Sequence, residues 1–373
     1  MVTVKEIAKI CGVSASTVSN VLNNKPNVGE ESRRRVLEAV NRTGYHPNYL
    51  AASIRRQNSR LIGVIVEDLC QFTTPLIVET IMKECEMREY RTILLNLWLY
   101  DRWQDTWYQD EEKLRSVVVP ALQELESIKV DGAIYVAGHG RVIRCFPKDY
   151  AIPTVVAYGE SENGRFPSIL IDDEAGGYDM GKYLISMGHK KIAILAGVAI
   201  NMHSRLRLEG FQRALFEANI PYNPKWLMHG TWQRESGYEN AKALLDTGTS
   251  VIWCMNDQMA GGVYDYFYEH GIAVGRDVSV AGYDNMSESS YLHPRLTTNE
   301  LPLREIGRQA AKRIIGMVEG EEERPGETNS AAGSDGAQEN GAGGSPGSEA
   351  SGYGKTWVPC TMILGDSVWR KDG

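Results

Sequence analysis

The chain has 373 residues, of which 42% are hydrophobic and 24% are charged, and its formal net charge is -8 at pH 7. This length accommodates two or three packed domains. No apolar run is long enough to span a bilayer, and the N-terminus lacks the apolar core and cleavage site of a signal peptide, so we expect a cytoplasmic protein with no membrane partner. The six cysteines include no C-x-x-C pair, which argues against a zinc site or a disulfide framework.

The charge is unevenly distributed along the chain. Residues 1–60 contain ten Lys/Arg and four Asp/Glu, a net charge of +6, whereas residues 61–373 have a net charge of -14. A basic head on an acidic body indicates a polyanionic partner for the head, although chance clustering of solvated charge would give the same balance.

The head is predicted to contain three helices. Thr3 and Glu6 have capping-box spacing and start the first helix, which Gly12 interrupts. Ser14 can cap a second helix, and a third is expected over Glu30–Thr43. The side chains of this third helix that we expect to face inward are Val36, Leu37, Ala39 and Val40. Two short helices joined by a glycine-containing turn, with a third packed behind, form a helix-turn-helix unit.

The outer face of the second helix carries hydrogen-bonding groups without charge. These side chains are Thr17, Ser19, Asn20, Asn23 and Asn24. Small amides and hydroxyls can read the base edges in the major groove, whereas a lysine- and arginine-rich helix would bind phosphate with little discrimination. An ordinary amphipathic surface helix is the alternative interpretation.

The stretch "VTVKEIAKICGVSASTVSNVLNNKPNVGEESRRRVLEAVNRTGYHPNYLAASIRR" resembles the DNA-binding headpiece of the lactose-repressor (LacI/GalR) family. The resemblance implies a helix-turn-helix domain over residues 1–46 whose second helix enters the major groove of operator DNA. It implies base contacts by Ala15, Ser16 and Asn20. It implies phosphate contacts by Ser14, Thr17, Ser19 and Asn23. Many relatives have Arg at the position of Asn20, and because Asn favours adenine and Arg favours guanine, the preferred base there stays open.

The segment "HPNYLAASIRR" resembles the hinge helix of the same family, which orders on operator DNA. The resemblance implies a hinge over residues 47–58 with Asn48, Ala51 and Ile54 at the minor groove. Most relatives have Leu at the position of Ile54, and either side chain can wedge into a base step. A simple linker helix is the alternative.

The body alternates strand-like apolar runs with helical patterns. The runs are "RLIGVIV", "RTILLNL", "VDGAIYV", "IPTVVAY", "SILID", "KKIAILAG", "SVIWCMND" and "VSVAGYD". This alternation predicts open parallel sheets with helices on both faces, which bind small ligands at the carboxyl ends of the strands. The segment "GGYDMGK", residues 176–182, fits a phosphate-binding loop only in part, because Tyr183 follows where Ser or Thr is needed, and it is predicted to be helical.

The body also resembles the effector domain of the lactose-repressor family, a fold similar to periplasmic sugar-binding proteins. The motifs that carry this resemblance are "LISMGHKKIAILAG", "SRLRLEGF", "NDQMAGG", "DVSVAGYDN" and "HPRLTTN". It implies an effector and dimerisation domain over residues 59–373. The first subdomain would comprise about 60–163 and 291–323, and the second about 164–290 and 355–373.

The same resemblance implies five effector-binding residues. They are Phe72, Arg207, Trp232, Asn256 and Asp284. Guanidinium and carboxylate groups can hold the adjacent hydroxyls of a sugar in paired hydrogen bonds, and an aromatic ring can lie against the sugar face. A structural ion pair or a core aromatic is the alternative for each residue, and the isolated His189 and His203 are expected to be structural or surface groups.

Two stretches differ from the family pattern. The aromatic segment 97–112 is predicted to add a core helix, although it could instead extend the ligand wall or form a contact surface. Residues 324–354 are dominated by Gly, Ser, Ala and Glu, which predicts a disordered loop inserted before the strand-like "TWVPCTMIL".

The sequence therefore predicts a ligand-responsive DNA-binding regulator, most simply a dimeric repressor of carbohydrate genes that binds a palindromic operator and a sugar. We expect no catalysis, no cofactor and no metal site. A purine or a phosphorylated carrier protein could replace the sugar as effector. A sugar-processing enzyme and a transport receptor are the alternatives from other classes, and no catalytic base, phosphate site or signal peptide supports them.

Overall fold

The computed structural model describes residues 2–22, 25–45, 59–104, 110–321 and 353–371. The chain divides into two compact units, Met1–Arg60 and Leu61–Gly373. The proposed hinge over 47–58, with Asn48, Ala51 and Ile54, lies outside the described residues. So do Asn23 and nearly all of the 324–354 loop.

The first unit contains three helices, α1 (Val4–Cys11), α2 (Ala15–Leu22) and α3 (Glu30–Thr43). The predicted capping box is present: the Glu6 amide donates to the Thr3 hydroxyl, and the Thr3 amide donates to the Glu6 carboxylate at 2.7 Å. Gly12 ends α1 with a φ of 60°, a left-handed conformation that glycine adopts without strain.

The core of the first unit lies between the three helices. Ile7, Val18 and Val36 are each 0% exposed, so every helix contributes to it. Arg35 on α3 also donates a hydrogen bond to the carbonyl of Cys11. Leu37 was expected to face inward but is 44% exposed, because it is rotated by about 100° from Val36 around the helix axis.

The second unit contains two parallel sheets, and each of the predicted apolar runs forms a strand in one of them. The six-stranded sheet has the order β13-β7-β5-β3-β1-β2 and the four-stranded sheet the order β11-β10-β8-β9. The strands of the first are β1 (Leu61–Val66), β2 (Arg91–Asn96), β3 (Gly132–Val136), β5 (Thr154–Ala157), β7 (Ser168–Asp172) and β13 (Lys355–Pro359). Those of the second are β8 (Ile192–Ala196), β9 (Leu227–His229), β10 (Val251–Cys254) and β11 (Ser279–Ala281). Two small pairs, β4 (Val142–Ile143) with β6 (Glu160–Ser161) and β12 (Thr298–Glu300) with β14 (Thr361–Ile363), complete the strands described.

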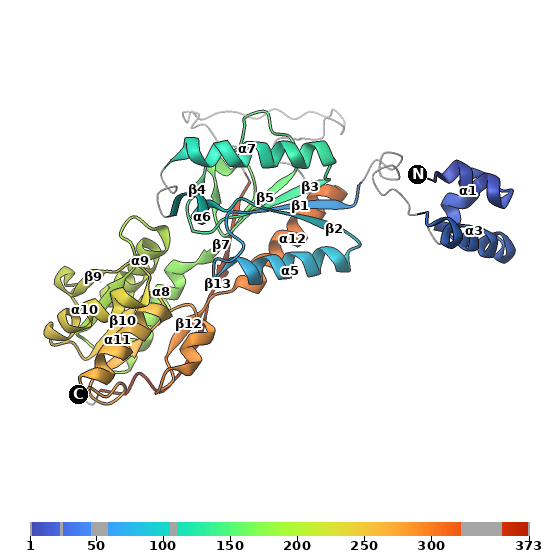
Figure 1. Ribbon diagram of the computed structural model, residues 1–373. Coiled ribbons are helices and arrows are strands. Elements are labelled where there is room, and N and C mark those ends of the chain that lie inside the picture. Colours follow the sequence, from blue (N-terminus) through green and yellow to red (C-terminus); the bar gives the residue numbers. More distant parts are fainter. Residues whose placement is uncertain (1, 23–24, 46–58, 105–109, 322–352, 372–373) are drawn as a thin grey trace, which may run out of the picture. The chain divides into compact units, whose positions relative to one another are not determined.

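Helices cover both faces of each sheet (Figure 1). Along β1, Val64 and Val66 belong to the core shared with α5 and α12, whereas Ile65 belongs to the core shared with α7, as the alternation of side chains in a strand requires. Helices α8 and α9 pack together beside the four-stranded sheet, and so do α10 and α11. The helices of this unit are α5 (Thr74–Met87), α6 (Leu99–Trp103), α7 (Glu111–Ile128), α8 (Asp173–Ser186), α9 (Met202–Glu217), α10 (Arg234–Asp246), α11 (Asp257–Glu269) and α12 (Leu303–Glu319). The short 3-10 helices are η2 (Glu162–Gly164), η3 (Pro224–Trp226) and η4 (Ser287–Tyr291).

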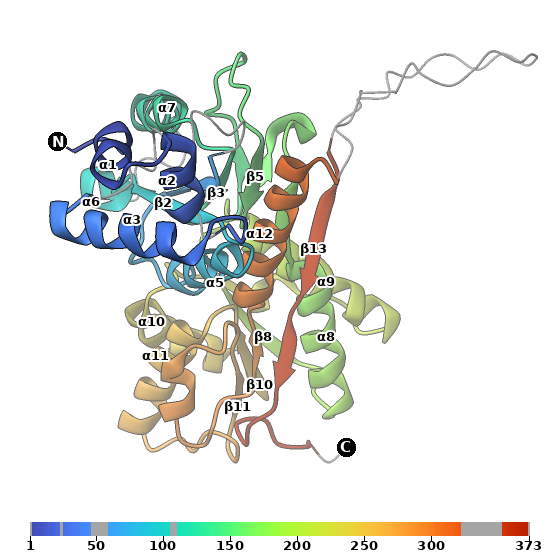
Figure 2. The same ribbon diagram turned by 90° about the vertical axis from the view of Figure 1, so that its right-hand side faces the viewer.

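We call the six-stranded sheet with its helices the first lobe and the four-stranded sheet with its helices the second lobe. Strands β7 and β13 were expected in the second lobe, as parts of 164–290 and 355–373, but both pair in the six-stranded sheet. Figure 2 shows β13 in the first lobe, with the C-terminal end of the chain beside the second. Apolar periodicity identifies a buried strand but does not indicate which sheet the strand joins. For this reason the predicted boundary between the two subdomains was misplaced.

The glycine-rich segment 176–182 is part of α8, as its helical pattern predicted. Its glycines allow close packing, because a Cβ at Gly177 would collide with the backbone of Arg207, and one at Gly181 would lie 2.8 Å from Ala214. On α9, a Cβ at Gly210 would likewise collide with the carbonyl of Glu174. Helices α8 and α9 therefore approach closely, which brings the start of α8 next to Arg207.

Within the aromatic stretch 97–112, Leu99–Trp103 form the short helix α6. Leu99 is 0% exposed and anchors it, and Trp103 packs against the same core. Trp98 and Tyr100 are 53% and 44% exposed, so they add little to the core. Residues 105–109, with Trp107 and Tyr108, lie outside the described residues.

Candidate functional site

Helix α2 presents two of the three predicted base-reading residues, Ser16 and Asn20, on its outer side, whereas Ala15 is half-buried and packs against the core. Its N-terminus is capped by Ser14, whose hydroxyl accepts a hydrogen bond from the Thr17 amide at 3.0 Å. Val18 and Val21 face the core and are buried. The polar side chains at the surface of this helix are Ser16, Thr17, Ser19 and Asn20. The apolar positions thus fix the orientation of the helix and leave the candidate DNA-contacting face outward.

Four of the five predicted effector residues come together in the second lobe, at the carboxyl ends of its strands. Trp232, Asn256 and Asp284 follow β9, β10 and β11, and Arg207 lies on α9, which follows β8. The contacts that join these four residues do not include Phe72, which lies between β1 and α5 with 43% of its surface exposed.

Arg207 is at the centre of this group and is only 2% exposed. Its Nε donates to Oδ1 of Asp173 at 2.7 Å, and its Nη1 donates to the carbonyl of Met255. The same Nη1 lies 3.6 Å from Oδ1 of Asp284. The guanidinium also lies over the ring of Tyr283, 3.7 Å from its centroid, a favourable placement for a cation.

Asn256 and Trp232 are held by each other and by the backbone. The Asn256 carboxamide accepts from the Met259 amide at 2.9 Å and so caps α11, while its NH2 group donates to the carbonyl of Trp232 at 2.8 Å. The indole of Trp232 lies against the Cα of Gly197, where a side chain would have no room. The guanidinium of Arg207 lies 5.9 Å from the centroid of the Trp232 ring.

Asp284 has a backbone φ of 110°, a conformation that residues other than glycine seldom adopt. Strain of this kind concentrates at functional positions. Burial raises the pKa of the Asp284 carboxyl well above its usual value, and the charge of Arg207 offsets only part of that rise. For Asp173, burial also raises the pKa, but the charge of Arg207 and the hydrogen bonds from His203 and Arg207 outweigh it, and the net pKa lies below the usual value.

Three residues of this cluster were not anticipated from the sequence. Asp173 starts α8 directly after β7, so the rule that ligands bind at strand carboxyl ends could have identified it. Tyr283 precedes Asp284 and carries no distinguishing pattern. His203 was expected to be structural or superficial, yet its Nδ1 lies 2.5 Å from Oδ2 of Asp173. His189, in contrast, binds Ser250 and the carbonyl of Trp369 inside the second lobe, as a structural histidine does.

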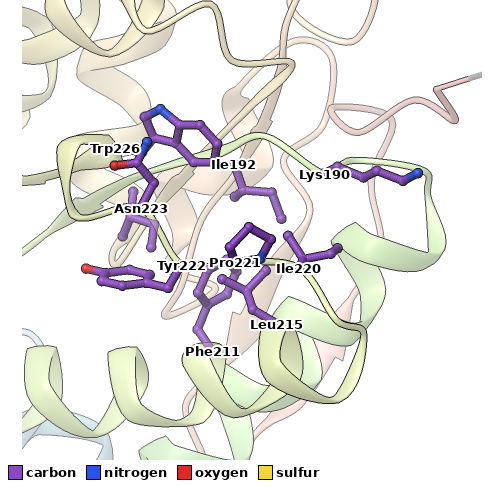
Figure 3. Close-up of a pocket in the computed structure, with 10 residues that line it drawn as sticks. Lys190, Ile192, Phe211, Leu215, Ile220, Pro221, Tyr222, Asn223 and Trp226 are labelled. Carbon is purple, nitrogen blue, oxygen red and sulfur yellow. The ribbon is translucent and has the colours of Figure 1, made fainter.

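A separate shallow pocket, with room for about one water molecule, lies at the opposite end of β8 (Figure 3). It is bordered by apolar side chains of β8 and α9 and by the segment that leads to β9. These include Ile192, Phe211, Leu215, Pro221, Tyr222 and Trp226. The pocket lies by the first residue of β8 and is therefore distinct from the cluster around Arg207.

Neither a metal-binding cluster nor a membrane-spanning helix is present among the residues that the structure describes. Over these residues, no group of three His, Cys, Asp or Glu side chains is placed to hold a metal ion. None of the helices described has both the length and the apolar character needed to cross a bilayer.

Comparison with known proteins gives matches for both units. Residues 3–48 match the family described as bacterial regulatory proteins, lacI family, and residues 182–332 match a periplasmic binding protein-like domain. The HTH-type transcriptional repressor PurR of Histophilus somni (strain 129Pt) is 32% identical over 324 residues, covering 85% of this chain and 92% of the relative. The PurR repressor of Vibrio parahaemolyticus serotype O3:K6 (strain RIMD 2210633) is 29% identical over 327 residues, covering 86% and 93%. A solved lac repressor dimer bound to operator and the anti-inducer ONPF has a TM-score of 0.74 at 23% identity and covers 99% of both chains, which shows a shared fold.

Proposed function

The chain belongs to the LacI family of bacterial regulatory proteins, and from this premise we propose how its two units act. The protein is a DNA-binding transcriptional regulator with a helix-turn-helix unit and an effector-binding unit. We propose that it is a repressor, that it works in the cytoplasm on the nucleoid, and that it has no catalytic activity. The PurR relatives are named as repressors, which supports this interpretation.

We propose that a homodimer binds a palindromic operator, because a two-fold dimer presents two recognition helices to two half-sites. Ser16 and Asn20 on the outer face of α2 would contact bases, together with Ala15. Ser14, Thr17, Ser19 and Asn23 would contact phosphates. Asn48, Ala51 and Ile54 stay predicted minor-groove contacts.

For the effector, we propose a sugar that binds at the cluster of Arg207, Asp284, Asn256 and Trp232. The observation that carries this proposal is the meeting of a buried guanidinium and a buried carboxyl 3.6 Å apart, next to a flat indole. Adjacent sugar hydroxyls need donors and acceptors placed in this way, and the apolar face of a sugar ring needs an aromatic partner. Phe72, exposed in the first lobe, would close the site from the other side.

A purine is the second candidate effector, and the similarity to the repressors named PurR favours it. A phosphorylated carrier protein as corepressor is the third. Titration calorimetry of the full chain with a panel of mono- and disaccharides, hypoxanthine and guanine distinguishes the first two. Binding of a sugar that Trp232→Ala weakens would support the sugar proposal, and binding of a purine alone would overturn it.

A further inference from the structure

His203 joins the two lobes through a single imidazole ring. It lies in the first turn of α9 and is 7% exposed. Its Nε2 accepts a hydrogen bond at 3.0 Å from the amide of Gly140, and its Nδ1 lies 2.5 Å from Oδ2 of Asp173. Because a backbone amide can only donate, Nε2 must be unprotonated, so the ring is neutral and Nδ1 donates to Asp173.

This ring belongs to a helix of the second lobe but is contacted by residues of the first lobe. Gly140 follows β3 of the six-stranded sheet, and the ring of Tyr158, which follows β5, lies 5.2 Å from the imidazole. His203 itself lies on α9, which packs with α8 beside the four-stranded sheet. The Gly140–His203 hydrogen bond therefore connects the first lobe to the second.

The segment that carries Gly140 is held firmly on the side of the first lobe. The carboxylate of Glu67, 0% exposed, accepts hydrogen bonds from the Gly138 amide and the Tyr135 hydroxyl, each at 2.6 Å. It also pairs with the guanidinium of Arg141. A Cβ at Gly140 would lie 2.7 Å from Nε2 of His203, so glycine is needed for the imidazole to approach the amide.

The carboxylate of Asp173 orients both His203 and Arg207. Oδ2 of Asp173 accepts from His203, and Oδ1 accepts from Arg207 at 2.7 Å. We propose that His203 is a positioning residue that holds the two lobes together at Gly140 and, through Asp173, couples their closure to the orientation of Arg207. The coupling to Arg207 rests on the proposed effector site, whereas the contact between the lobes does not.

Hydrogen exchange of the full-length protein without ligand tests the contact between the lobes. His203→Phe keeps a ring of similar size but removes both hydrogen bonds. We expect exchange of the 138–143 segment to become roughly fivefold faster, since one hydrogen bond is worth about 1 kcal/mol. Gly140→Ala should have the same effect, because its Cβ displaces the imidazole. The control is His189→Phe, which removes a buried histidine that bonds only within the second lobe and should leave this segment unchanged.

A nitrogen-15 spectrum of the wild-type imidazoles gives a second readout that does not depend on how well a variant folds. We expect the His203 resonances of a neutral ring with the proton on Nδ1. A proton on Nε2, or unchanged exchange in both His203→Phe and Gly140→Ala, would overturn the proposal. Calorimetry of His203→Phe with the effector found in the panel then tests the coupling. Faster exchange with unaltered effector affinity would refute the coupling to Arg207 and leave the proposed effector site standing.

Discussion

Arg207→Ala should destabilise the protein strongly, because it leaves two buried carboxyl groups without their cation. The side chains of Asp173 and Asp284 are 1% and 5% exposed, and Arg207 is the cation that contacts both. Removing one partner of a buried ion pair costs about 3–5 kcal/mol, since the remaining charge stays desolvated. The hydrogen bond to the carbonyl of Met255 is lost as well.

Urea unfolding of a double-mutant cycle measures this cost. Asp173→Asn keeps an acceptor for His203 but removes the charge, so we expect the double variant with Arg207→Ala to lose less stability than the two single losses added together. The control is Arg234→Ala, whose pair with Asp265 is 46% and 43% exposed and should contribute at most about 1 kcal/mol. A loss below about 1 kcal/mol for Arg207→Ala, or additive losses in the cycle, would refute the buried-charge argument.

Three further predictions concern DNA reading, pH and the loop. Asn20→Ala should lose discrimination at one symmetric base pair of each half-site, by about 1–3 kcal/mol, and an unchanged consensus in a selected-sequence binding assay would exclude Asn20 from base reading. Burial raises the pKa of Asp257 to about 7, despite hydrogen bonds from Thr298 and the Met286 amide. In the native state this carboxyl therefore keeps its proton up to about pH 7, whereas in the unfolded state it releases the proton near the usual pKa of Asp. The free energy of unfolding should consequently fall by up to about 1.4 kcal/mol per pH unit as pH rises from about 5 to about 7. Asp257→Asn should reduce this slope but not abolish it, because the raised pKa of Asp284 contributes a slope of the same sign. An equally steep slope in that variant would exclude Asp257 as a contributor. Deletion of residues 326–352 should leave the melting temperature and operator affinity nearly unchanged, because loop-closure entropy depends weakly on length. A loss of regulation at an unchanged melting temperature would instead indicate a partner for the loop.

Strands were predictable wherever the chain has a continuous apolar run. Parallel strands buried on both faces need such runs, and β1, with Val64 and Val66 at 0% exposure, is an example. Strand β9 was missed because Leu227–His229 is short and none of its residues is fully buried. The sheet that β7 and β13 join depends on long-range pairing, which periodicity does not report.

The candidate site was found only in part for a similar reason. The resemblance to a known family identified Arg207, Asn256 and Asp284, but Asp173 and His203 acquire their positions through the close packing of α8 and α9. That packing depends on glycines of the segment 176–182, whose sequence also partly matches a phosphate-binding loop. Local patterns therefore located the strand ends correctly but not the side chains that distant segments bring to them.

The central claim is that a small molecule bound near Asp284 controls operator binding by the first unit. Fluorescence anisotropy of labelled operator DNA, with and without the effector identified by calorimetry, tests it in the wild type and in Asp284→Gly. Glycine suits the φ of 110° at this position, so the substitution removes the carboxyl without adding backbone strain. We predict that Asp284→Gly binds operator with wild-type affinity in the absence of effector and no longer responds when effector is added. An unaltered response in this variant would contradict the assignment of the effector site.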